Sequence, residues 1–511
     1  MIDTESRLLR RGDYIWGSFV RTGPVDGYIV AVNPGDRSDV LGRFAFTVTA
    51  VDEAVGAAHE GRRAWQDTPL EDRGEIVGRF RELLDEVGEN LALLITRETG
   101  KPLWESRAEV SATARAAKLL VSDGLPLLQP KVLREDTAWS ERVPLGVVGV
   151  VTPFTYPLLL PSLHCLAALL AGNTVVFKPS KFAPGVGQAL AELLDRCRLP
   201  RGAFNMVQGS GASVGARLVS HPGLDALLFT GSYDTACKVR AATADRPELP
   251  VLLQAGGKAA ALVLADADLD LAAYEIAVSA FATAGQRHDA AARVFVDRAI
   301  FDTFCERLLA RTQELVVGYG FDHGVFMGPM ISDAHRKRFR AYADDLQALG
   351  HTPVLEGGTA QLDGPRGYYV RPAIYWITRD GALDAEPPGP MVQVYCVTDT
   401  DHMVSLHEQL ASRVSAAIFT RDEGGAMELA QRLTTGAVYV NRGTSATSLR
   451  MPAVPRGRST NGVPHGAELV RWLTSPQALL VDRRPFDGSR FVPGAGSLPT
   501  APMVIEPDDE G

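Results

Sequence analysis

The sequence predicts an α/β protein with doubly wound parallel sheets. From residue 143 onward, short β-branched and apolar runs alternate with amphipathic helical segments. Buried parallel strands are typically continuous apolar runs, and the helices between them cover both faces of the sheet. The 511 residues exceed what one hydrophobic core normally holds, so we expect two to four domains. The composition, 46% hydrophobic and 22% charged, is that of an ordinary globular protein.

Before residue 143 the pattern predicts an arm, strands and three helices. The first 25 or so residues are polar and suit an arm, whereas residues 27–50 alternate as strands do. Helical periodicity then covers three segments, which are the stretch up to about Asp67, 71–98 and 104–123. Thr49 or Asp52 is a suitable N-cap for the first of them.

Two successive α/β patterns follow. The first consists of strands at Val147–Val151, Thr174–Lys178, Phe204–Gln208 and Ala226–Thr230, with helices at Leu158–Leu170, Gly185–Cys197 and Ser213–Ser220. The second begins after Lys258 with strands at Ala261–Leu264 and Arg293–Val296, helices over 269–283 and 300–316, and a last strand at Val438–Asn441. Residues Trp472–Asp482 predict one further strand, and the Pro/Gly-rich acidic residues 493–511 are expected to be disordered.

Charge and cysteine usage exclude several classes of function. A net charge of −9 argues against a nucleic-acid partner, because phosphate binding needs a basic face. No apolar run approaches the ~20 residues of a membrane span, and the charged N-terminus has no signal h-region. The five cysteines are scattered without a CxxC pair, which predicts reduced thiols in a cytoplasmic protein. We predict no metal site.

Two strand ends carry residues that suit a nucleotide cofactor. Lys178 and Ser180 follow one predicted strand, where a lysine can contact ribose hydroxyls or a phosphate. Gly231 and Ser232 lie between a strand and a helix, where backbone N–H groups and the helix dipole favour a pyrophosphate. Taken alone, each turn is also typical of a simple strand–helix connection.

The loop at 284–293, Ala-Gly-Gln-Arg-His-Asp-Ala-Ala-Ala-Arg, resembles the nucleophile loop of aldehyde dehydrogenases. That loop has the pattern Gly-Gln-x-Cys, with Arg after four more residues. The resemblance runs from about residue 27 to 480 and looks most like succinate-semialdehyde dehydrogenase-type members. Its other motifs are Pro-Leu-Gly-Val-Val-Gly-Val-Val-Thr-Pro at 144–153, Ala-Gly-Asn-Thr-Val-Val-Phe-Lys-Pro-Ser at 171–180, Phe-Thr-Gly-Ser at 229–232, Gly-Gly-Lys at 256–258, Gly-Pro at 389–390 and Gly-Ala-Val-Tyr-Val-Asn at 436–441.

The family resemblance implies an aldehyde dehydrogenase-like α/β fold with three working parts. These are a Rossmann-type dinucleotide-binding domain (27–130 and 147–255), an α/β catalytic-type domain (256–445) and a β oligomerisation arm (131–146 and 468–485). An N-terminal arm (1–26) and a tail (486–511) lie outside them. The implied partners are a small-molecule substrate and copies of the chain itself, as a homodimer or homotetramer, with a hetero-oligomer with another enzyme as an alternative.

The resemblance also implies cofactor contacts, residue by residue. Lys178, with Ser180 beside it, would bind the adenosine ribose, and Ser232, with Gly231, the pyrophosphate. Glu386 would hold the nicotinamide ribose. Lys181 stands where NAD-preferring members often have glutamate, so a cation there favours the 2′-phosphate of NADP. A solvent-facing Lys181 and the use of NAD stay open.

The catalytic positions that the resemblance implies have all changed. The family mechanism needs a thiolate, an amide donor for the oxyanion and a glutamate that activates water. Those positions hold His288, Thr155 and Gln254. Losing an oxyanion donor typically costs ~10²–10³ in rate and losing a general base ~10²–10⁴, so we expect ordinary thioester chemistry to be absent. Cys165 and Cys237 are more typical of packing residues than of substitute nucleophiles.

Histidine chemistry is the alternative that the sequence offers. An imidazole with an unperturbed pKa near ~6.5 can act as acid, base or hydrogen-bond donor. His164 lies nine residues after Thr155, about two and a half helical turns on, and we expect it to converge with His288. Four arginines could contact a carboxylate or phosphate or simply face solvent: Arg287, Arg450, Arg456 and Arg458.

Three hypotheses about function follow. The first is an atypical NAD(P)H-dependent oxidoreductase that transfers a hydride to an imine or activated carbonyl, with His288 as acid/base. The second is a catalytically inactive family member that acts as a scaffold or oligomeric partner. The third is non-redox acid/base chemistry with His288. Loss of three catalytic groups beside a retained cofactor half motivates each of them.

Overall fold

The computed structural model describes residues 11–20, 24–378, 386–445, 448–462 and 466–483. Two compact units divide the chain: Met1–Leu128 with Val143–Ser475, and Gln129–Arg142 with Pro476–Gly511. The larger unit contains two seven-stranded sheets. The smaller unit contains a three-stranded sheet in the order β23-β6-β5, formed by β5 (Lys131–Arg134), β6 (Ala138–Pro144) and β23 (Thr474–Leu480).

The first sheet of the larger unit is parallel over five strands, as the sequence predicts. Its order is β11 (Val251–Ala255), β10 (Ala226–Gly231), β7 (Val147–Val151), β8 (Thr174–Lys178), β9 (Phe204–Met206), β1 (Asp13–Ile15) and β2 (Ser18–Val20). β1 pairs antiparallel with β9 and with β2. Residues 13–20 therefore extend the sheet instead of forming the expected arm, because the buried side chains of Tyr14 and Ile15 pack into the core.

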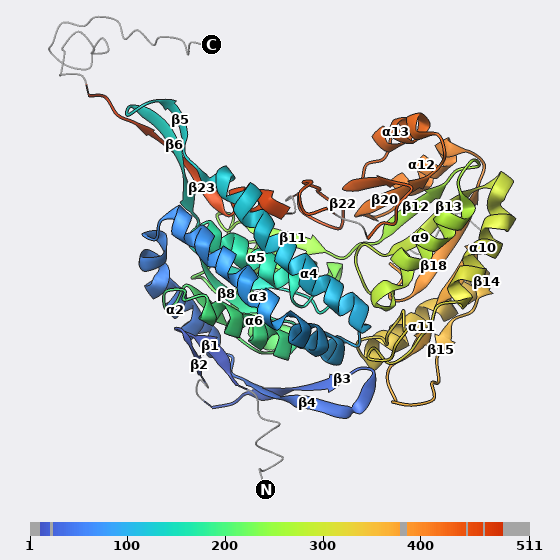
Figure 1. The fold of residues 1–511 in the computed structure, drawn as a ribbon, viewed down its shortest axis with the longest axis horizontal. Helices are drawn as coiled ribbons and strands as arrows, with labels where there is room; N and C mark the ends of the chain where they lie inside the picture. The colour runs from blue at the N-terminus through green and yellow to red at the C-terminus, as the bar shows by residue number, and fades with distance from the viewer. Residues whose placement is uncertain (1–10, 21–23, 379–385, 446–447, 463–465, 484–511) are drawn as a thin grey trace, which may run out of the picture. The chain divides into compact units, whose positions relative to one another are not determined.

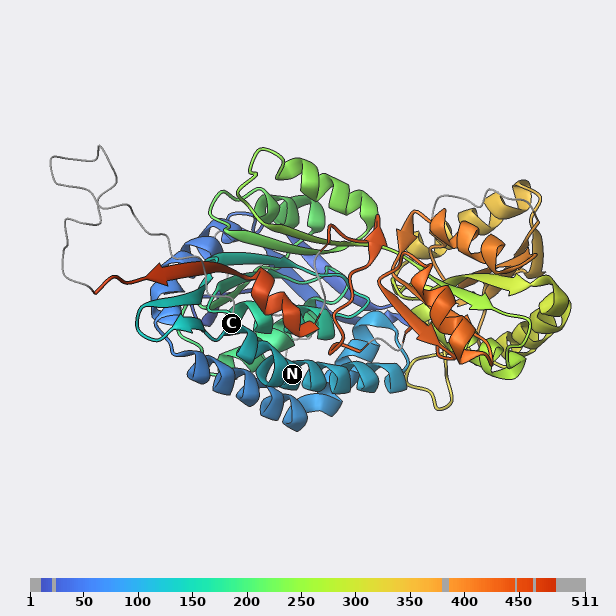
Figure 2. The same cartoon turned by 90° about the horizontal axis from the view of Figure 1, so that it is seen from above.

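Helices cover both faces of this sheet (Figures 1 and 2). One layer consists of α3 (Leu70–Thr99), α4 (Leu103–Leu119), α5 (Leu159–Leu170) and α6 (Pro184–Arg196). The other consists of α2 (Ala50–Gln66), α7 (Ala216–Val219) and α8 (Tyr233–Ala242). Alternate residues of β7 point to opposite layers, Val148 and Val150 to the first and Val147 to the second. This two-sided burial explains the continuous apolar sequence of the strand.

The second sheet confirms the second α/β pattern. Its order is β14 (Thr352–Leu355), β17 (Ala373–Ile377), β18 (Met391–Val397), β13 (Ala291–Asp297), β12 (Ala259–Val263), β20 (Ser415–Phe419) and β21 (Ala437–Val440). Only the edge strand β14 is antiparallel to its neighbour. One apolar core joins this sheet to α9 (Leu269–Phe281), α10 (Phe301–Gln313), α11 (Asp333–Ala348), α12 (Thr400–Glu408) and α13 (Glu423–Gln431).

Smaller elements complete the larger unit. They are the hairpin β3 (Gly27–Asn33) and β4 (Asp36–Phe46), the two-stranded pairs β15 (Gly358–Thr359) with β16 (Val370–Arg371) and β19 (Ser412–Arg413) with β22 (Arg456–Gly457), the helix α14 (Leu469–Trp472), and 3₁₀ turns at Leu125–Leu128, Ala282–Gly285, Arg298–Ile300 and Gly466–Glu468. Among the described residues, no helix has the length and apolar character of a bilayer span. The same residues contain no group of three or more histidines, cysteines or acidic side chains placed to hold a metal ion.

Several predicted helix boundaries differ from the structure. The helix expected at 213–220 is a π-helical turn, Gly211–Gly215, followed by the short α7. The helix over 104–123 ends at Leu119 and continues as a second π-helical turn, Leu120–Gly124. Thr49 takes the N-cap position of α2 without a side-chain capping bond, and Asp52 instead accepts hydrogen bonds from Arg217. The expected disorder of 493–511 lies outside the described residues.

Candidate active site

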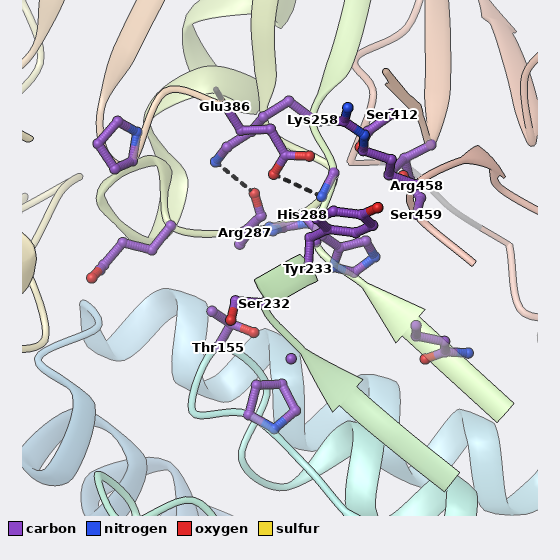
Figure 3. Close-up of a pocket in the computed structure, with 18 of the residues that line it drawn as sticks. Thr155, Ser232, Tyr233, Lys258, Arg287, His288, Glu386, Ser412, Arg458 and Ser459 are labelled. Carbon is purple, nitrogen blue, oxygen red and sulfur yellow. Dashed lines mark hydrogen bonds between the residues drawn. The ribbon is translucent and has the colours of Figure 1, made fainter. Parts of the chain in front are cut away.

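A cavity of about 580 Å³ opens where the loops after β7, β10 and β11 meet residues of the second α/β pattern. Figure 3 shows many of the side chains that line it. The lining residues are 153–155, 230–234, 254, 256–258, 286–288, 293, 335, 338, 386–388, 411, 412, 414, 455, 458 and 459. Ligands commonly bind beyond the carboxyl ends of parallel strands, so the topology alone favours this place.

Six of the predicted site residues line the cavity together: Thr155, Gly231, Ser232, Gln254, His288 and Glu386. Sequence positions that are more than two hundred residues apart thus converge, as expected for a site assembled from loops. The predicted catalytic positions (155, 254 and 288) and one predicted cofactor turn (231–232) line the same cavity.

The other predicted residues lie elsewhere. His164 is buried in α5 and is not among the lining residues, so the expected convergence with His288 is wrong. The His164 side chain packs inside the protein, because α5 is buried along almost its entire length. Lys178, Ser180 and Lys181 also lie outside the cavity. The Lys178 ammonium donates to the carbonyl of Pro179 at 2.7 Å, and burial, with Lys181 nearby, lowers its pKa to about 8.

A turn of unusual backbone conformation precedes His288. Thr283 and Ala284 have φ angles of 53° and 51°, and Gly285 has a φ of 60°. Left-handed backbone costs a non-glycine residue about 1–2 kcal/mol, so neighbouring contacts must hold the turn. Glu105 of α4 does this, because its carboxylate accepts hydrogen bonds from the Thr283 N–H at 3.0 Å and from the Thr283 hydroxyl. A Cβ at Gly285 would meet the Gly389 carbonyl oxygen at 2.4 Å, so only glycine fits there.

Buried charges surround the loop on the side of α4. Arg287 and Asp289 form a two-point ion pair at 2.9 and 2.6 Å. The Tyr156 ring contacts two cations, with its centroid 5.0 Å from the Arg287 guanidinium and 4.7 Å from the Lys101 ammonium. Lys101 in turn pairs with Glu109 at 2.7 Å. Sequence reasoning missed this network, although Glu105 and Glu109, one helical turn apart, were a visible signal.

Burial shifts the pKa values of the ionisable groups in and around the His288 loop. It lowers the pKa of His288 below its usual value, although the charge of Asp289 opposes the shift, so the imidazole is neutral at pH 7. Burial also lowers the pKa of Lys258 to about 8. The Lys258 ammonium donates to the carbonyls of Gly285 at 2.5 Å and Arg287 at 2.9 Å and thereby holds the His288 loop. Burial alone would raise the pKa of Asp289, but the charge of Arg287 keeps it below its usual value.

Other polar groups that line the cavity have defined orientations. The side-chain carbonyl of Gln254 accepts a hydrogen bond from the Thr230 hydroxyl at 3.0 Å, which leaves its amide N–H₂ to donate. The carboxylate of Glu386 accepts a hydrogen bond from the Gly257 N–H at 2.9 Å (Figure 3). Thr155 is buried at the cavity wall and presents a hydroxyl, which both donates and accepts.

Three aromatic rings close together form a further feature that sequence reasoning missed. Phe154, Phe182 and His335 make edge-to-face contacts in all three pairs, with centroids 5.6 Å apart. Burial lowers the pKa of His335 to about 4, so its ring is uncharged at neutral pH. The trio joins the loops after β7 and β8 to α11, and Phe154 and His335 line the cavity.

The cavity wall contains no cysteine. Cys165 and Cys197 are buried, Cys237 is exposed, and Cys305 and Cys396 are partly buried. None of them is among the lining residues. Burial raises the pKa of the Cys197 thiol to about 12 and raises that of Cys165 as well, which disfavours a thiolate at either position.

The residues at one end of the cavity fit a nicotinamide dinucleotide. The N-terminus of α8, with Gly231 and Ser232 before it, opens on the cavity and offers the N–H groups and dipole that phosphate prefers. Gly256 has a φ of +63°, and a Cβ there would come within 3.2 Å of the Glu386 carboxylate. Glycine at this position therefore keeps space open beside Glu386, the side chain that the resemblance assigns to the nicotinamide ribose.

Comparison with known proteins shows the family to which the chain belongs. The model of the aldehyde dehydrogenase family matches residues 22–478. The N-succinylglutamate 5-semialdehyde dehydrogenase of Burkholderia thailandensis is 35% identical over 471 residues, covering 91% of this chain and 95% of that protein. The lactaldehyde dehydrogenase of Escherichia coli has a TM-score of 0.87 at 28% identity, covering 93% of this chain and 99% of the other.

A third relative is a cysteine-to-alanine variant of an aldehyde dehydrogenase from Pseudomonas syringae, solved in a complex with NAD⁺ and octanal. It has a TM-score of 0.87 at 28% identity and covers 95% of this chain and 99% of the other. The fold and the family that the sequence motifs predicted are thereby confirmed. The chain belongs to the aldehyde dehydrogenase family of NAD(P)-dependent oxidoreductases.

Proposed function

We propose that this protein is an NAD(P)-dependent oxidoreductase that acts on a small aldehyde without forming a thioester, with His288 as the general base. The observation that carries the proposal is which nucleophilic or basic side chains line the cavity. His288 lines it, whereas none of the five cysteines does. A covalent thioester needs a thiolate, and an imidazole offers proton transfer instead.

The lowered pKa of His288 decides between its two roles. A neutral imidazole accepts a proton, whereas donation from an imidazolium would require pH values below the depressed pKa. This favours the oxidative direction over the reduction of an imine or activated carbonyl considered from the sequence. A bound nicotinamide would supply the hydride acceptor. In an aldehyde hydrate, loss of hydride from carbon and of one hydroxyl proton to His288 leaves the carboxylic acid.

Thr155 and Gln254 would orient the substrate. The Gln254 carbonyl is engaged by Thr230, so its amide N–H₂ can donate to a substrate oxygen. The Thr155 hydroxyl lines the same space. The Gln254 amide and the Thr155 hydroxyl are both uncharged. They can therefore bind the hydroxyl groups of an aldehyde hydrate, and neither of them competes with His288 as a base.

An acidic semialdehyde is the proposed substrate class. The Burkholderia relative is named for N-succinylglutamate 5-semialdehyde, a compound with two carboxylates besides the aldehyde. The exposed arginines Arg338 and Arg458 line the cavity here, and neither pairs with a carboxylate in the described part of the chain. Unpaired guanidinium groups at a cavity wall favour an anionic ligand.

Turnover of a panel of aldehydes tests the proposal. The assay would measure how fast purified protein forms NADH from NAD⁺ or NADPH from NADP⁺. The substrates would be succinic semialdehyde, an N-acylglutamate semialdehyde and octanal. We expect turnover of an acidic aldehyde that is lost in His288→Ala and survives alkylation of the exposed thiol. Activity that persists in His288→Ala, or that is lost on alkylation, would refute the role of His288.

A scaffold function is the second candidate, supported by the three changed catalytic positions together. The same assay separates it, because a scaffold binds its partner without turnover. Mass measurement of the chain mixed with an active relative would then show hetero-oligomers. Turnover that needs His288 but no dinucleotide would instead support the non-redox hypothesis.

The proposed preference for NADP over NAD rests on Lys181. Its ammonium lies 5.1 Å from the centroid of the Phe182 ring and lowers the pKa of nearby Lys178 together with burial. Two close cations favour a phosphate dianion. We expect Lys181→Glu to weaken NADP⁺ binding about tenfold or more while leaving NAD⁺ binding similar. Equal affinities of the wild-type protein for the two dinucleotides would contradict the preference.

The domain assignment and the oligomeric arm remain proposals as well. Val132, Leu133 and Leu480 of the smaller unit are 60%, 72% and 81% exposed, and apolar side chains on a short sheet favour pairing with a second copy. We expect Leu133→Asp with Leu480→Asp to reduce the solution mass from that of an oligomer to that of one chain. An unchanged mass would assign the interface elsewhere.

A further inference from the structure

Two buried serines line the cavity, one in a short antiparallel pair of strands and one just after it. β19 and β22 pair with Ser412 opposite Gly457, and Ser459 follows β22 by two residues. Ser412 and Ser459 both line the cavity and are 6% and 3% exposed. Figure 3 shows them next to Arg458, gathered on one side of the cavity beside Tyr233.

The hydroxyl of Ser459 has no hydrogen-bond partner in the described part of the chain. A buried polar group without a partner destabilises the folded protein, so a native fold that retains one at a cavity wall points to a partner outside the chain. The hydroxyl lies against Gly257, where an added Cβ would come within 2.8 Å of it. The glycine therefore leaves the serine hydroxyl room beside the cavity.

Arg458 supplies positive charge next to this hydroxyl. Its backbone N–H donates to the Ala411 carbonyl at 2.8 Å, and its guanidinium lies 5.2 Å from the centroid of the Tyr233 ring. The ring holds the guanidinium over the cavity without neutralising it, since a cation–π contact leaves the N–H edges available. No carboxylate of the described residues forms an ion pair with Arg458.

The backbone that carries these groups is anchored to the first sheet. The Ser459 carbonyl accepts from the Ala255 N–H at 2.7 Å. The Asn461 side chain accepts from the Leu253 N–H at 2.9 Å and donates to the Val251 carbonyl at 2.5 Å. The segment therefore runs along β11, next to Gln254, and a ligand that it holds stays in a fixed place relative to that residue.

We propose that Arg458, Ser412 and Ser459 form a subsite for a carboxylate of the substrate, remote from its aldehyde group. The two hydroxyls and the guanidinium offer several donors on one wall, which is the set that a carboxylate accepts. The inference rests on the proposed function, because it assigns the part of that substrate which does not react. A phosphate of the cofactor has related chemistry, and the experiment separates the two.

Calorimetric binding of small probes to the complete protein tests the subsite without relying on turnover. The probes are succinate and its uncharged analogue succinamide, with NAD⁺ and NADP⁺ measured in parallel. We expect succinate to bind and succinamide not to bind. Arg458→Gln should weaken succinate about tenfold or more and leave both dinucleotides unchanged. Arg456→Gln is the matched control, because Arg456 lies two residues before Arg458, is likewise exposed and does not line the cavity.

Ser459→Ala gives a second readout that a purely structural serine would not produce. Removing an unpartnered buried hydroxyl should raise the melting temperature of the ligand-free protein, while the affinity for succinate falls. The subsite is refuted if succinate fails to bind, if Arg456→Gln weakens it as much as Arg458→Gln does, or if Arg458→Gln weakens the dinucleotides instead. His288→Ala should still bind succinate, so failure of the reaction and failure of the subsite remain distinguishable.

Discussion

Arg287 and Asp289, the two neighbours of His288 in the chain, face each other across a buried two-point ion pair of 2.9 and 2.6 Å. Both side chains are about nine-tenths buried. Because the pair closes around a single residue, it restricts the backbone of His288 from both sides. The loop also depends on Glu105, which lies 4.0 Å from Arg287, and on Lys258. The position of the imidazole is thus set by charges that do not themselves react.

We expect Asp289→Asn to destabilise the protein by about 3–5 kcal/mol, since removing one partner leaves the Arg287 charge buried without full compensation. Glu86→Gln is the control, because Glu86 pairs with Arg196 at a similar 2.6 Å distance on the surface, where an ion pair contributes less than about 1 kcal/mol. Denaturant unfolding of both variants measures the difference. Equal effects would contradict a buried structural role.

Glu105→Gln should loosen the turn before His288. The glutamine can accept only one of the two hydrogen bonds from Thr283 and brings an N–H₂ group toward a donor, so we expect a loss of about 1–3 kcal/mol. Amide hydrogen exchange would show faster opening at 282–290 and unchanged exchange in α10. Uniform acceleration across the protein would mean that Glu105 supports global stability only.

A pH effect on stability is expected from Asp13. Burial raises its pKa to about 7, with Glu53 adding to the shift and the Gln208 N–H opposing it. The folded protein therefore binds this proton more tightly than the unfolded chain does, whose aspartate has a pKa near ~3.9. The resulting stability is present in acid and declines as the pH rises from about 4 to 7, by at most about 4 kcal/mol.

Asp13→Asn removes that titration and keeps the oxygen that accepts from Gln208 at 2.6 Å. We expect the variant to melt higher than the wild type at pH 8 and at a similar temperature at pH 5. Melting curves over this range measure both values. A wild-type profile without a decline between pH 5 and 8 would exclude the buried titration.

The proposed base predicts the pH profile of turnover. His288 must be deprotonated to accept a proton, and its pKa lies below 6.5, so kcat/KM should be constant above that pH and fall only below it. Lys258, with a pKa of about 8, would produce a rise near pH 8 if it were the base instead. The position of the acidic limb therefore distinguishes these two residues.

His288→Cys tests how much of the family's machinery remains. A thiol at this position can add to an aldehyde and form a thioester, but Gln254 cannot activate water to hydrolyse it. We expect one equivalent of reduced nicotinamide in a burst, followed by arrest, and continued turnover once Gln254→Glu is added. A variant without a burst would show that substrate and cofactor do not meet at residue 288 and would favour the scaffold function.

Local pattern and motif spacing were enough to predict the α/β class, most strands and the family. Parallel strands buried on both faces have apolar sequences that differ from the helices between them, as β7 and β8 do. The same motifs located Thr155, Gln254 and His288 in one cavity. Boundaries were less predictable where the backbone departs from regular geometry, as at the π-helical turn Gly211–Gly215 and the left-handed residues Thr283 and Ala284.

The sequence by itself determined the family, because its motifs and their spacing are recognisable without coordinates, and it predicted that His288 occupies the position of the family's nucleophile. Only the tertiary structure decided what that histidine can do. Its protonation depends on burial and on Asp289, and its backbone depends on Glu105 and Lys258, which lie far away in the chain. Electrostatic and packing energies fall off with distance in space, so the sequence alone could neither exclude His164 nor bring Ser459 to the cavity.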